Sequence, residues 1–405
     1  MLGIREYNDL DLKVYHPKEG RPDQSVGLPG INRWSTIGDM HGNALKLLDF
    51  VHLEDIANIL AIHYQQFIQD YDDAQTKALQ DQDVQNESAE EEAQKKRVNA
   101  VKHFYREVLP FITVIPGTNF RAIGDLLGDR GANDFFTLLL IGKLMDGGAN
   151  VEIILSNHDS FFIQWMEARL EGRRVEPWKA AGAGQAESLR RLDELVELGV
   201  VQMDHLTKLY NQYKQTLKLL SYDYNERGEF VLYSHAHLDE RGVLSMAEGL
   251  LDWYKDMNPD IKKSLTALCD RLATKPNEMI SEEDTKALVD LINEVVKESA
   301  SKNKLTGLVN LSSVRLSPEQ LKGKGIDPGA SPVFYALWNR DDIDRQTRAS
   351  PDPRPKNPAI INTHGHHTYP QEFAICLDNP LGKFANTVGT LTCTRTSPVN
   401  VLKHN

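Results

Sequence analysis

Residues 120–131 have the sequence FRAIGDLLGDRG. An apolar run typical of a buried strand ends at a turn that carries Asp125, Asp129 and Arg130 between glycines. Four other places also have an apolar run followed by Asp, His or Asn. They are residues 34–37 before GDMHG at 38–42, 151–155 before SNHD at 156–159, 230–233 before His235, and 359–361 before His364 and His366. Because strands deliver such side chains to one edge of a sheet, we expect these strand ends to converge on a metal site.

The side chains at these strand ends form a mixed nitrogen and oxygen donor set. Asp125 is the carboxylate that can bridge two cations with its two oxygens. Such a set, without cysteine, suits Mn, Fe or Zn. Two ions about 3.5–4 Å apart activate a water and stabilise an in-line displacement at phosphorus. The expected ligands are Asp39, His41, Asp125, Asn157, His235 and one of His364 and His366.

Three further residues beside these ligands suit phosphate chemistry. Arg130 can hold two phosphate oxygens in a bidentate fork. His158 follows Asn157 and is expected to protonate a leaving oxygen, while Asp129 orients His158 and keeps it protonated. Each short motif alone is more often a surface ion pair or a turn, and it is their combination that predicts a metal site.

The order and residues of these segments resemble the PPP branch of the calcineurin-like metallophosphoesterases. The family pattern is GD-x-HG, GD-x-x-DRG, GNH(E/D) and two further histidines, and the arginine at position 130 is the mark of the PPP branch. Residues 337–340, LWNR, resemble a Trp-Asn-Arg segment of phage and bacterial members. That likeness implies that Arg340 is a second phosphate-binding arginine; the alternative is an ion pair with Asp341 or Asp342.

The resemblance implies a fold, a ligand assignment and an activity. The fold is an α/β calcineurin-like β-sandwich flanked by helices and carrying helical, hairpin-like insertions. One metal is held by Asp39, His41 and Asp125, and the other by Asp125, Asn157, His235 and His364, with His366 as an auxiliary ligand. The activity is hydrolysis of phosphomonoesters on protein side chains, phosphotyrosine or phosphoserine/threonine, by attack of metal-bound hydroxide. Mn²⁺ is the expected metal, with Fe or Zn as alternatives.

The chain departs from the family pattern at several positions. Ser156 replaces the usual Gly before Asn-His, Ala236 and His237 stand where two glycines are usual, and Thr363 precedes His364. The spacer at residues 51–109 is longer than the family's short helix. The helical elaboration is similar to that of the Wip effector phosphatases of Legionella, which implies host phosphoproteins as partners, docked through the helical insertions.

The rest of the chain is expected to divide around this catalytic domain. Residues 1–33 are predicted to be a loosely structured lead-in, residues 34–395 the phosphatase domain, and residues 396–405 a tail. Helical insertions are expected at about 51–109, 172–224 and 246–310, the first as a hairpin with an acidic tip. A strand is also predicted at residues 333–337.

Bulk properties narrow the possible functions. The formal net charge of −12 argues against a nucleic-acid-binding surface, which needs clustered Lys and Arg. The three cysteines, Cys269, Cys376 and Cys393, indicate a reducing compartment, and none begins the C-x5-R loop of a cysteine-based phosphatase. No signal peptide or run of about 20 apolar residues is present. We therefore expect a soluble protein, either cytoplasmic or secreted into a host cytosol.

Two other functions stay open at this point. Small-molecule phosphohydrolases, such as dinucleoside-polyphosphate hydrolases, share these motifs, but their pockets do not need large helical insertions. A binding module that keeps the fold without activity is the other alternative. Such proteins typically lose a ligand or the acid histidine, and this chain has all of them.

Overall fold

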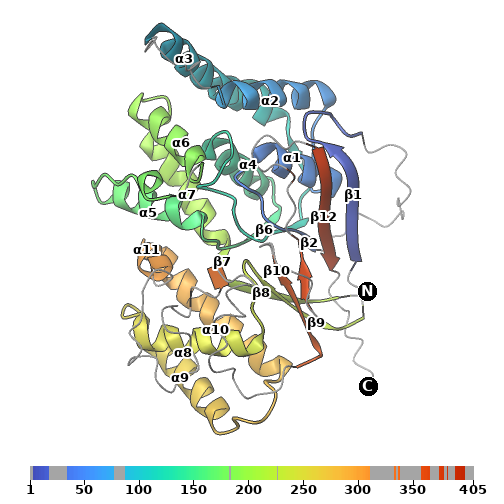
Figure 1. Cartoon of the computed structure of the whole chain (residues 1–405), viewed down its shortest axis with the longest axis vertical. Coiled ribbons are helices and arrows are strands. Elements are labelled where there is room, and N and C mark those ends of the chain that lie inside the picture. The colour runs from blue at the N-terminus through green and yellow to red at the C-terminus, as the bar shows by residue number, and fades with distance from the viewer. Residues whose placement is uncertain are drawn as a thin grey trace.

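Two β-sheets with helices packed around them form the centre of the computed structural model of this chain (Figure 1). The architecture is mixed α/β with large helical insertions, as the sequence predicts. The structure describes residues 3–17, 34–76, 87–181, 184–225, 227–310, 333, 336–337, 357–364, 374–377, 381 and 388–396.

The larger sheet carries three of the five strand ends that the sequence singles out. Its central strands β2, β5 and β6 are parallel neighbours, with Trp34 opposite Asn119 and Asn119 opposite Asn150. The strand order is β1 (Gly3–Asp11), β12 (Val388–Thr396), β2 (Trp34–Ile37), β5 (Asn119–Ala122), β6 (Asn150–Ile154) and β7 (Leu217–Lys218).

The smaller sheet carries the other two strand ends. Its order is β11 (Ala374–Cys376), β10 (Ile360–His364), β9 (Phe230–Ser234) and β8 (Leu220–Tyr224). β9 and β10 are parallel, so His364 lies opposite Ser234, next to His235. A two-stranded ribbon joins β3 (Ala57–Asn58) to β4 (Thr113–Val114).

Helices cover the sheets and form the insertions. Side-chain caps mark several helix starts, as Asn43, Asn133 and Ser281 do for α1, α4 and α10. The helices around the larger sheet are α1 (Ala44–Leu53), α4 (Asp134–Asp146), α5 (Asp159–Leu170), α6 (Glu187–Glu197) and α7 (Met203–Thr216). A second group is α8 (Glu240–Trp253), α9 (Pro259–Ala273), α10 (Glu282–Ser301) and α11 (Leu305–Val309). Short helical turns are η1 (Phe104–Val108), η2 (Leu109–Phe111) and η3 (Pro177–Lys179).

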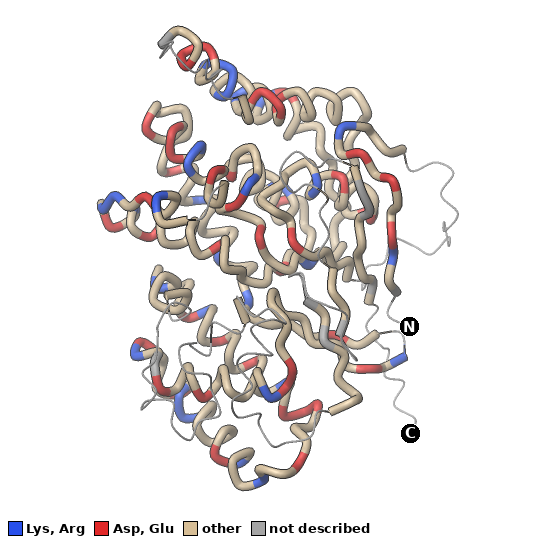
Figure 2. Tube along the Cα trace, viewed as in Figure 1, with Lys and Arg blue, Asp and Glu red and all other residues tan. Residues whose placement is uncertain are grey.

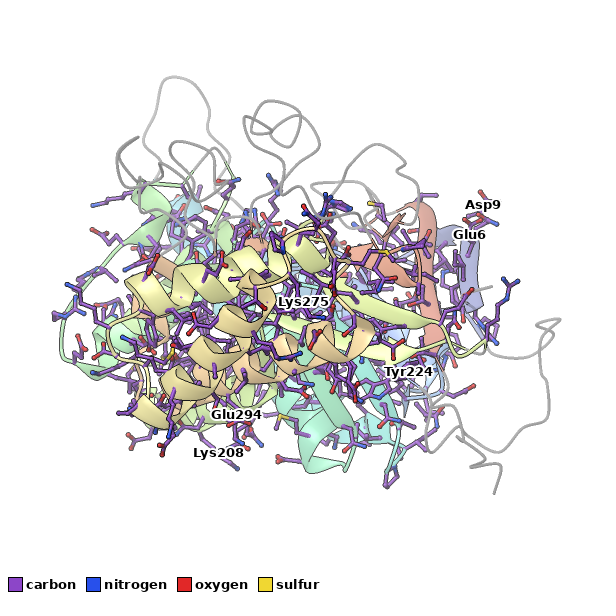
Figure 3. The ribbon with its side chains drawn as sticks, turned by 90° about the horizontal axis from the view of Figure 1, so that it is seen from below. Glu6, Asp9, Lys208, Tyr224, Lys275 and Glu294 are labelled. Atoms are coloured by element: carbon purple, nitrogen blue, oxygen red, sulfur yellow. The ribbon has the colours of Figure 1, made fainter. Side chains whose placement is uncertain are left out.

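The second group of helices is attached to the smaller sheet. Seen from below, α8, α9 and α10 form a layer, with Glu294 on α10, Lys275 just after α9 and Tyr224 at the end of β8 (Figure 3). The Tyr224 hydroxyl donates to Glu282 of α10, and Asn293 donates to the carbonyl of Leu220 at 2.8 Å. These bonds join α10 to both ends of β8.

The hairpin α2 (Ala61–Ala74) and α3 (Glu87–His103) stands out at the top of the molecule (Figure 1). The two helices pack against each other, and an Arg97 guanidinium nitrogen donates to the carbonyl of Thr76 at 2.8 Å. Acidic and basic residues are mixed along α3 (Figure 2). The expected helical hairpin is therefore present, although the residues between its helices, 77–86, lie outside the described part of the chain.

Three sequence-based expectations differ from the structure. The helical insertion expected at about 172–224 ends in strands, because its last residues form β7 and β8, one in each sheet. Residues 3–11, predicted to be part of a loosely structured lead-in, form β1, whose partner β12 lies at the other end of the chain. A register shift between Tyr7 and Leu10 interrupts this pairing, which hides the strand pattern. The predicted strand at 333–337 is wrong at the described positions Val333, Ala336 and Leu337, which are helical and buried. Periodicity alone does not separate a short buried strand from a buried helical turn.

A buried arginine joins the two sheets. Arg121 of β5 has its guanidinium carbon 4.8 Å from the ring of Trp34 and 4.2 Å from that of Tyr233 in the smaller sheet. Its Nε donates to Glu152 of β6 at 2.8 Å, and Lys218 donates to the same carboxylate at 2.6 Å. Burial alone raises the pKa of Glu152, but the charges of Arg121 and Lys218 outweigh it and hold the pKa at about 2 instead of 4.5.

We predict that Glu152→Gln lowers the free energy of unfolding by about 3–5 kcal/mol near neutral pH, because Arg121 loses its buried counter-charge. The folded-state pKa of Glu152 is depressed, so its stabilisation is fully present above the ordinary pKa of 4.5 and is lost as pH falls towards 2. Urea unfolding of the wild type and of Glu152→Gln over this pH range should give free energies of unfolding that converge at the acid end. Glu278→Gln, in an exposed ion pair with Lys275, is the control and should change little; equal stabilities of wild type and Glu152→Gln near neutral pH would contradict the prediction.

Candidate metal centre

The loops that follow β2, β5 and β9 are joined by hydrogen bonds. The amide of Gly42 donates to the carbonyl of Asp125 at 2.7 Å, and the amide of Met40 donates to the carbonyl of Gly124 at 3.3 Å. Nδ1 of His235 lies 3.2 Å from the carbonyl oxygen of Ile123. These three strand ends therefore meet at one place, as the sequence predicts.

Glycines make this close approach possible. A methyl group at Gly131 would lie 1.7 Å from the carbonyl oxygen of Gly42, and one at Gly124 would lie 2.4 Å from Nδ1 of His235. Gly124 also has a positive φ of 83°, which favours glycine. The glycines that flank the acidic residues are thus needed because backbone from one loop touches backbone or imidazole from another.

Asp39, Asp125 and His235 form a first cluster whose potential ligand atoms all lie within 4.8 Å of one another. Nε2 of His235 lies 2.8 Å from Oδ1 of Asn157 and 3.6 Å from Oδ1 of Asp125. Because the carbonyl of Ile123 can only accept, Nδ1 of His235 carries the hydrogen and Nε2 is the atom available to a cation. These three residues, with Asn157 beside them, are four of the residues that the sequence proposes as ligands.

His41, Asp125 and Asp129 form a second cluster within the same limit. Asp125 belongs to both clusters, which is the position that a bridging carboxylate needs. His41 and Asp125 have φ values of 55° and 53°. This left-handed conformation is uncommon for residues other than glycine and typical of functional sites. From the sequence, Asp129 is expected to orient His158. Its proximity to His41 makes it a further candidate ligand.

The donor set fits a divalent cation. The carboxyl groups of Asp39, Asp125 and Asp129 are buried. Oδ1 of Asp125 and Oδ2 of Asp129 receive no hydrogen bond from the described residues. A buried carboxylate oxygen without a hydrogen bond is destabilising unless a positive group compensates its charge. Burial lowers the pKa of His235, but Asp39 and Asp125 outweigh it and raise the pKa to about 10. The field inside the site therefore favours positive charge.

His158, Asp129 and Arg130 lie at the edge of the second cluster. Nδ1 of His158 is 3.3 Å from the carbonyl oxygen of Gly128 and 3.5 Å from Oδ1 of Asp129, while its Nε2 is 3.9 Å from Asp125. Two acceptors face Nδ1, so Nδ1 carries a hydrogen and Nε2 faces the centre. Arg130 donates to Oδ1 of Asp129 at 2.8 Å. Burial raises the pKa of Asp129, but His158, His41 and Arg130 outweigh it and keep the pKa below 3.8.

The unusual Ser156 has a clear local role. Its hydroxyl donates to Oδ2 of Asp159 at 2.8 Å and accepts from the amide of Asp159 at 3.1 Å. This reciprocal pair at the start of α5 resembles a capping box. Oδ1 of Asp159 accepts from the amide of Leu127 at 2.9 Å. Ser156 thus helps to fix the loop that carries Asp125.

Three sequence-predicted site residues are not placed in full. Arg340 and His366 lie outside the described residues. His364 is at the end of β10, beside the strand that ends before His235, and only its backbone is described. The amide of Ala236 donates to the carbonyl of Ala336 at 3.0 Å, so the chain four residues before Arg340 passes next to His235.

Sequence reasoning missed two features of the site. Lys46 of α1 is fully buried, and its Nζ donates to the carbonyl of Asp39 at 2.5 Å. A lysine within the apolar run of residues 44–48 is the signal that could have identified it. The chain also has three residues between Asp125 and Asp129, one more than the family pattern. Gly128, with φ of 67°, is in this longer turn, and a methyl group there would lie 2.6 Å from the carbonyl oxygen of His158.

Comparisons with known proteins give a family and a similar fold. The family model described as WipA-like, phosphatase domain, matches residues 119–383. The crystal structure of the phosphatase domain from the Legionella effector WipB has a similar fold, with a TM-score of 0.57. The two sequences are 24% identical, over 82% of this chain and 98% of that one. A search of curated proteins found no match.

We predict that Gly131→Ala separates the loops that carry His41 and Asp125, because the added methyl group overlaps the carbonyl of Gly42. The variant should lose about 1–3 kcal/mol of stability or more and bind fewer Mn²⁺ ions per chain. Thermal unfolding and metal analysis after gel filtration measure the two effects. Gly307→Ala is the control, since its nearest neighbour, Cε2 of Tyr254, is 3.8 Å away; a Gly131→Ala protein that behaves like this control would contradict the prediction.

Proposed function

The chain belongs to the WipA-like phosphatase domain family, and we propose that it is a phosphoprotein phosphatase that depends on two divalent metal ions. One observation carries the proposal. Asp125 is shared by two buried clusters of potential ligand atoms. His158 and Arg130 lie beside the second cluster, where both contact the carboxylate of Asp129. This arrangement supports metal-assisted hydrolysis of a phosphomonoester.

The proposed ligands follow the two clusters. Asp39, His41 and Asp125 would hold one ion, and Asp125, Asn157, His235 and His364 the other, with Asp129 and His366 as further candidates. Mn²⁺ suits this mixture of nitrogen and oxygen donors, and Fe or Zn would also fit. The two ions would supply Lewis acidity, which activates water and neutralises the charge of the phosphate.

The protein's own residues would perform the remaining steps. Arg130 would bind two phosphate oxygens through its guanidinium and fix the phosphorus in place. Nε2 of His158 would donate a proton to the leaving oxygen, while Asp129 and the carbonyl of Gly128 hold its Nδ1 hydrogen and so its ring orientation. Arg340 would be a second phosphate-binding arginine.

We further propose that the two sheets are the calcineurin-like sandwich of the PPP branch and that the substrate is a phosphorylated side chain of a protein. The projecting hairpin α2–α3 (Figure 1) supports a substrate of protein size, since a nucleotide pocket does not need such an arm. The likeness to a Legionella effector domain supports secretion and action on host proteins. No described helix combines the length and apolar character needed to cross a membrane.

We predict phosphate release from phosphotyrosine, phosphoserine or phosphothreonine peptides in the presence of Mn²⁺, and its loss with a chelator. His158→Ala and Asp39→Asn should each lower kcat by about two orders of magnitude or more, because they remove the general acid and a metal ligand. His205→Ala on α7 is the control and should keep full activity.

The same assay tests the alternative. A dinucleoside polyphosphate is included as a competing substrate, and turnover of this compound but of no peptide would favour a small-molecule hydrolase. Full peptide turnover with chelator present, or in His158→Ala, would contradict the proposed mechanism.

A further inference from the structure

The start of helix α6 is bonded to the loop that carries Asp129 and Arg130. The amide of Ala186 donates to the carbonyl of Gly128 at 2.9 Å. The amide and hydroxyl of Ser188 both donate to the carbonyl of Asp129, at 3.1 and 3.0 Å. Amides in the first turn of a helix have no partner within the helix, and here they bind the catalytic loop instead.

Arg191, one turn further along α6, binds the same loop. Its Nη1 donates to the carbonyl of Ala132 at 3.1 Å and to that of Gly131 at 3.3 Å. The side chain is buried, with Glu187 3.3 Å from Nη2. Together, α6 and the residue before it bind four carbonyls between Gly128 and Ala132, and Asp129 and Arg130 lie inside this interval.

α6 is in turn held by α5 and by α3 of the hairpin. Asp193 accepts from the indole nitrogen of Trp165 at 2.9 Å, and Glu194 accepts from Arg97 of α3 at 2.8 Å. The amide of Ala132 in the same loop donates to the hydroxyl of Tyr71 of α2 at 3.1 Å. The helices of the hairpin therefore reach the catalytic loop both directly and through α6.

The loop needs this support because of its own conformation. Residues 123–133 form neither helix nor strand, and both Asp125 and Gly128 have positive φ values. The proposed binding of two phosphate oxygens by Arg130 and the contact of Asp129 with His158 both depend on the position of this backbone. A displacement of about 1 Å at such groups can lower the rate 100-fold.

We propose that Arg191 is a positioning residue for the reaction, which fixes the backbone that presents Asp129 and Arg130, with Ser188 as a second support. This inference rests on the proposed phosphatase function. It gives the helical insertions a role within the catalytic site, distinct from docking of a substrate protein.

The experiment compares Arg191→Met with Arg190→Met in the full chain. Arg190 precedes Arg191 on the same helix, is exposed, and its guanidinium donates to Glu187. We expect Arg191→Met to lower kcat by about 10- to 100-fold, with weaker inhibition by inorganic phosphate, while Arg190→Met matches wild type. Arg191→Lys should recover part of the activity, because its ammonium group can reach one carbonyl.

Hydrogen exchange separates this inference from the proposed function. Exchange of the amides of residues 124–133 should be faster in Arg191→Met than in Arg190→Met, whether or not the wild type releases phosphate. If Arg191→Met does not fold, Ser188→Ala, which removes one hydroxyl bond, should show the same increase to a smaller extent. Equal loop exchange and equal kcat in the Arg191 and Arg190 variants would overturn the proposal.

Discussion

The structure depends on holding three carboxylates, those of Asp39, Asp125 and Asp129, close together and away from water. Such a cluster opposes folding unless positive groups compensate it. Lys46, Arg130 and His235 lie against these residues, and the raised pKa of His235 reports how strongly the site attracts positive charge. A pair of divalent ions would satisfy the same requirement, and this is the physical basis of the proposed function.

The rest of the fold can be understood as the means of building this cluster. Parallel strands bring the loops to one edge, and glycines let the backbones touch where any side chain would separate them. Helices then fix the loops from outside, through Asp159 for Leu127 and through Ser188 for Asp129. The insertions are therefore part of the support of the site as well as surface features.

Much of this organisation could be predicted from the sequence. The strands before Asp39, Asp125, Asn157 and His235 were recognisable because each is an apolar run that ends at a turn, and the structure brings these residues together. β1 was missed because its pairing is irregular and its partner is distant in the chain. Val333, Ala336 and Leu337 were misassigned because a short apolar run does not distinguish strand from helix.

Other features depend on tertiary contacts that no local pattern contains. The proximity of Asp129 to His41 and the bonds from Arg191 to the catalytic loop arise when segments far apart in sequence pack together. The turn around Gly128 has one residue more than the family pattern, but only the structure shows that its carbonyl contacts His158.

The most direct test of the central claim is anomalous diffraction from crystals grown with Mn²⁺. The account predicts two manganese peaks on either side of the Asp125 carboxylate, and a fully ordered site with no peak there would contradict it.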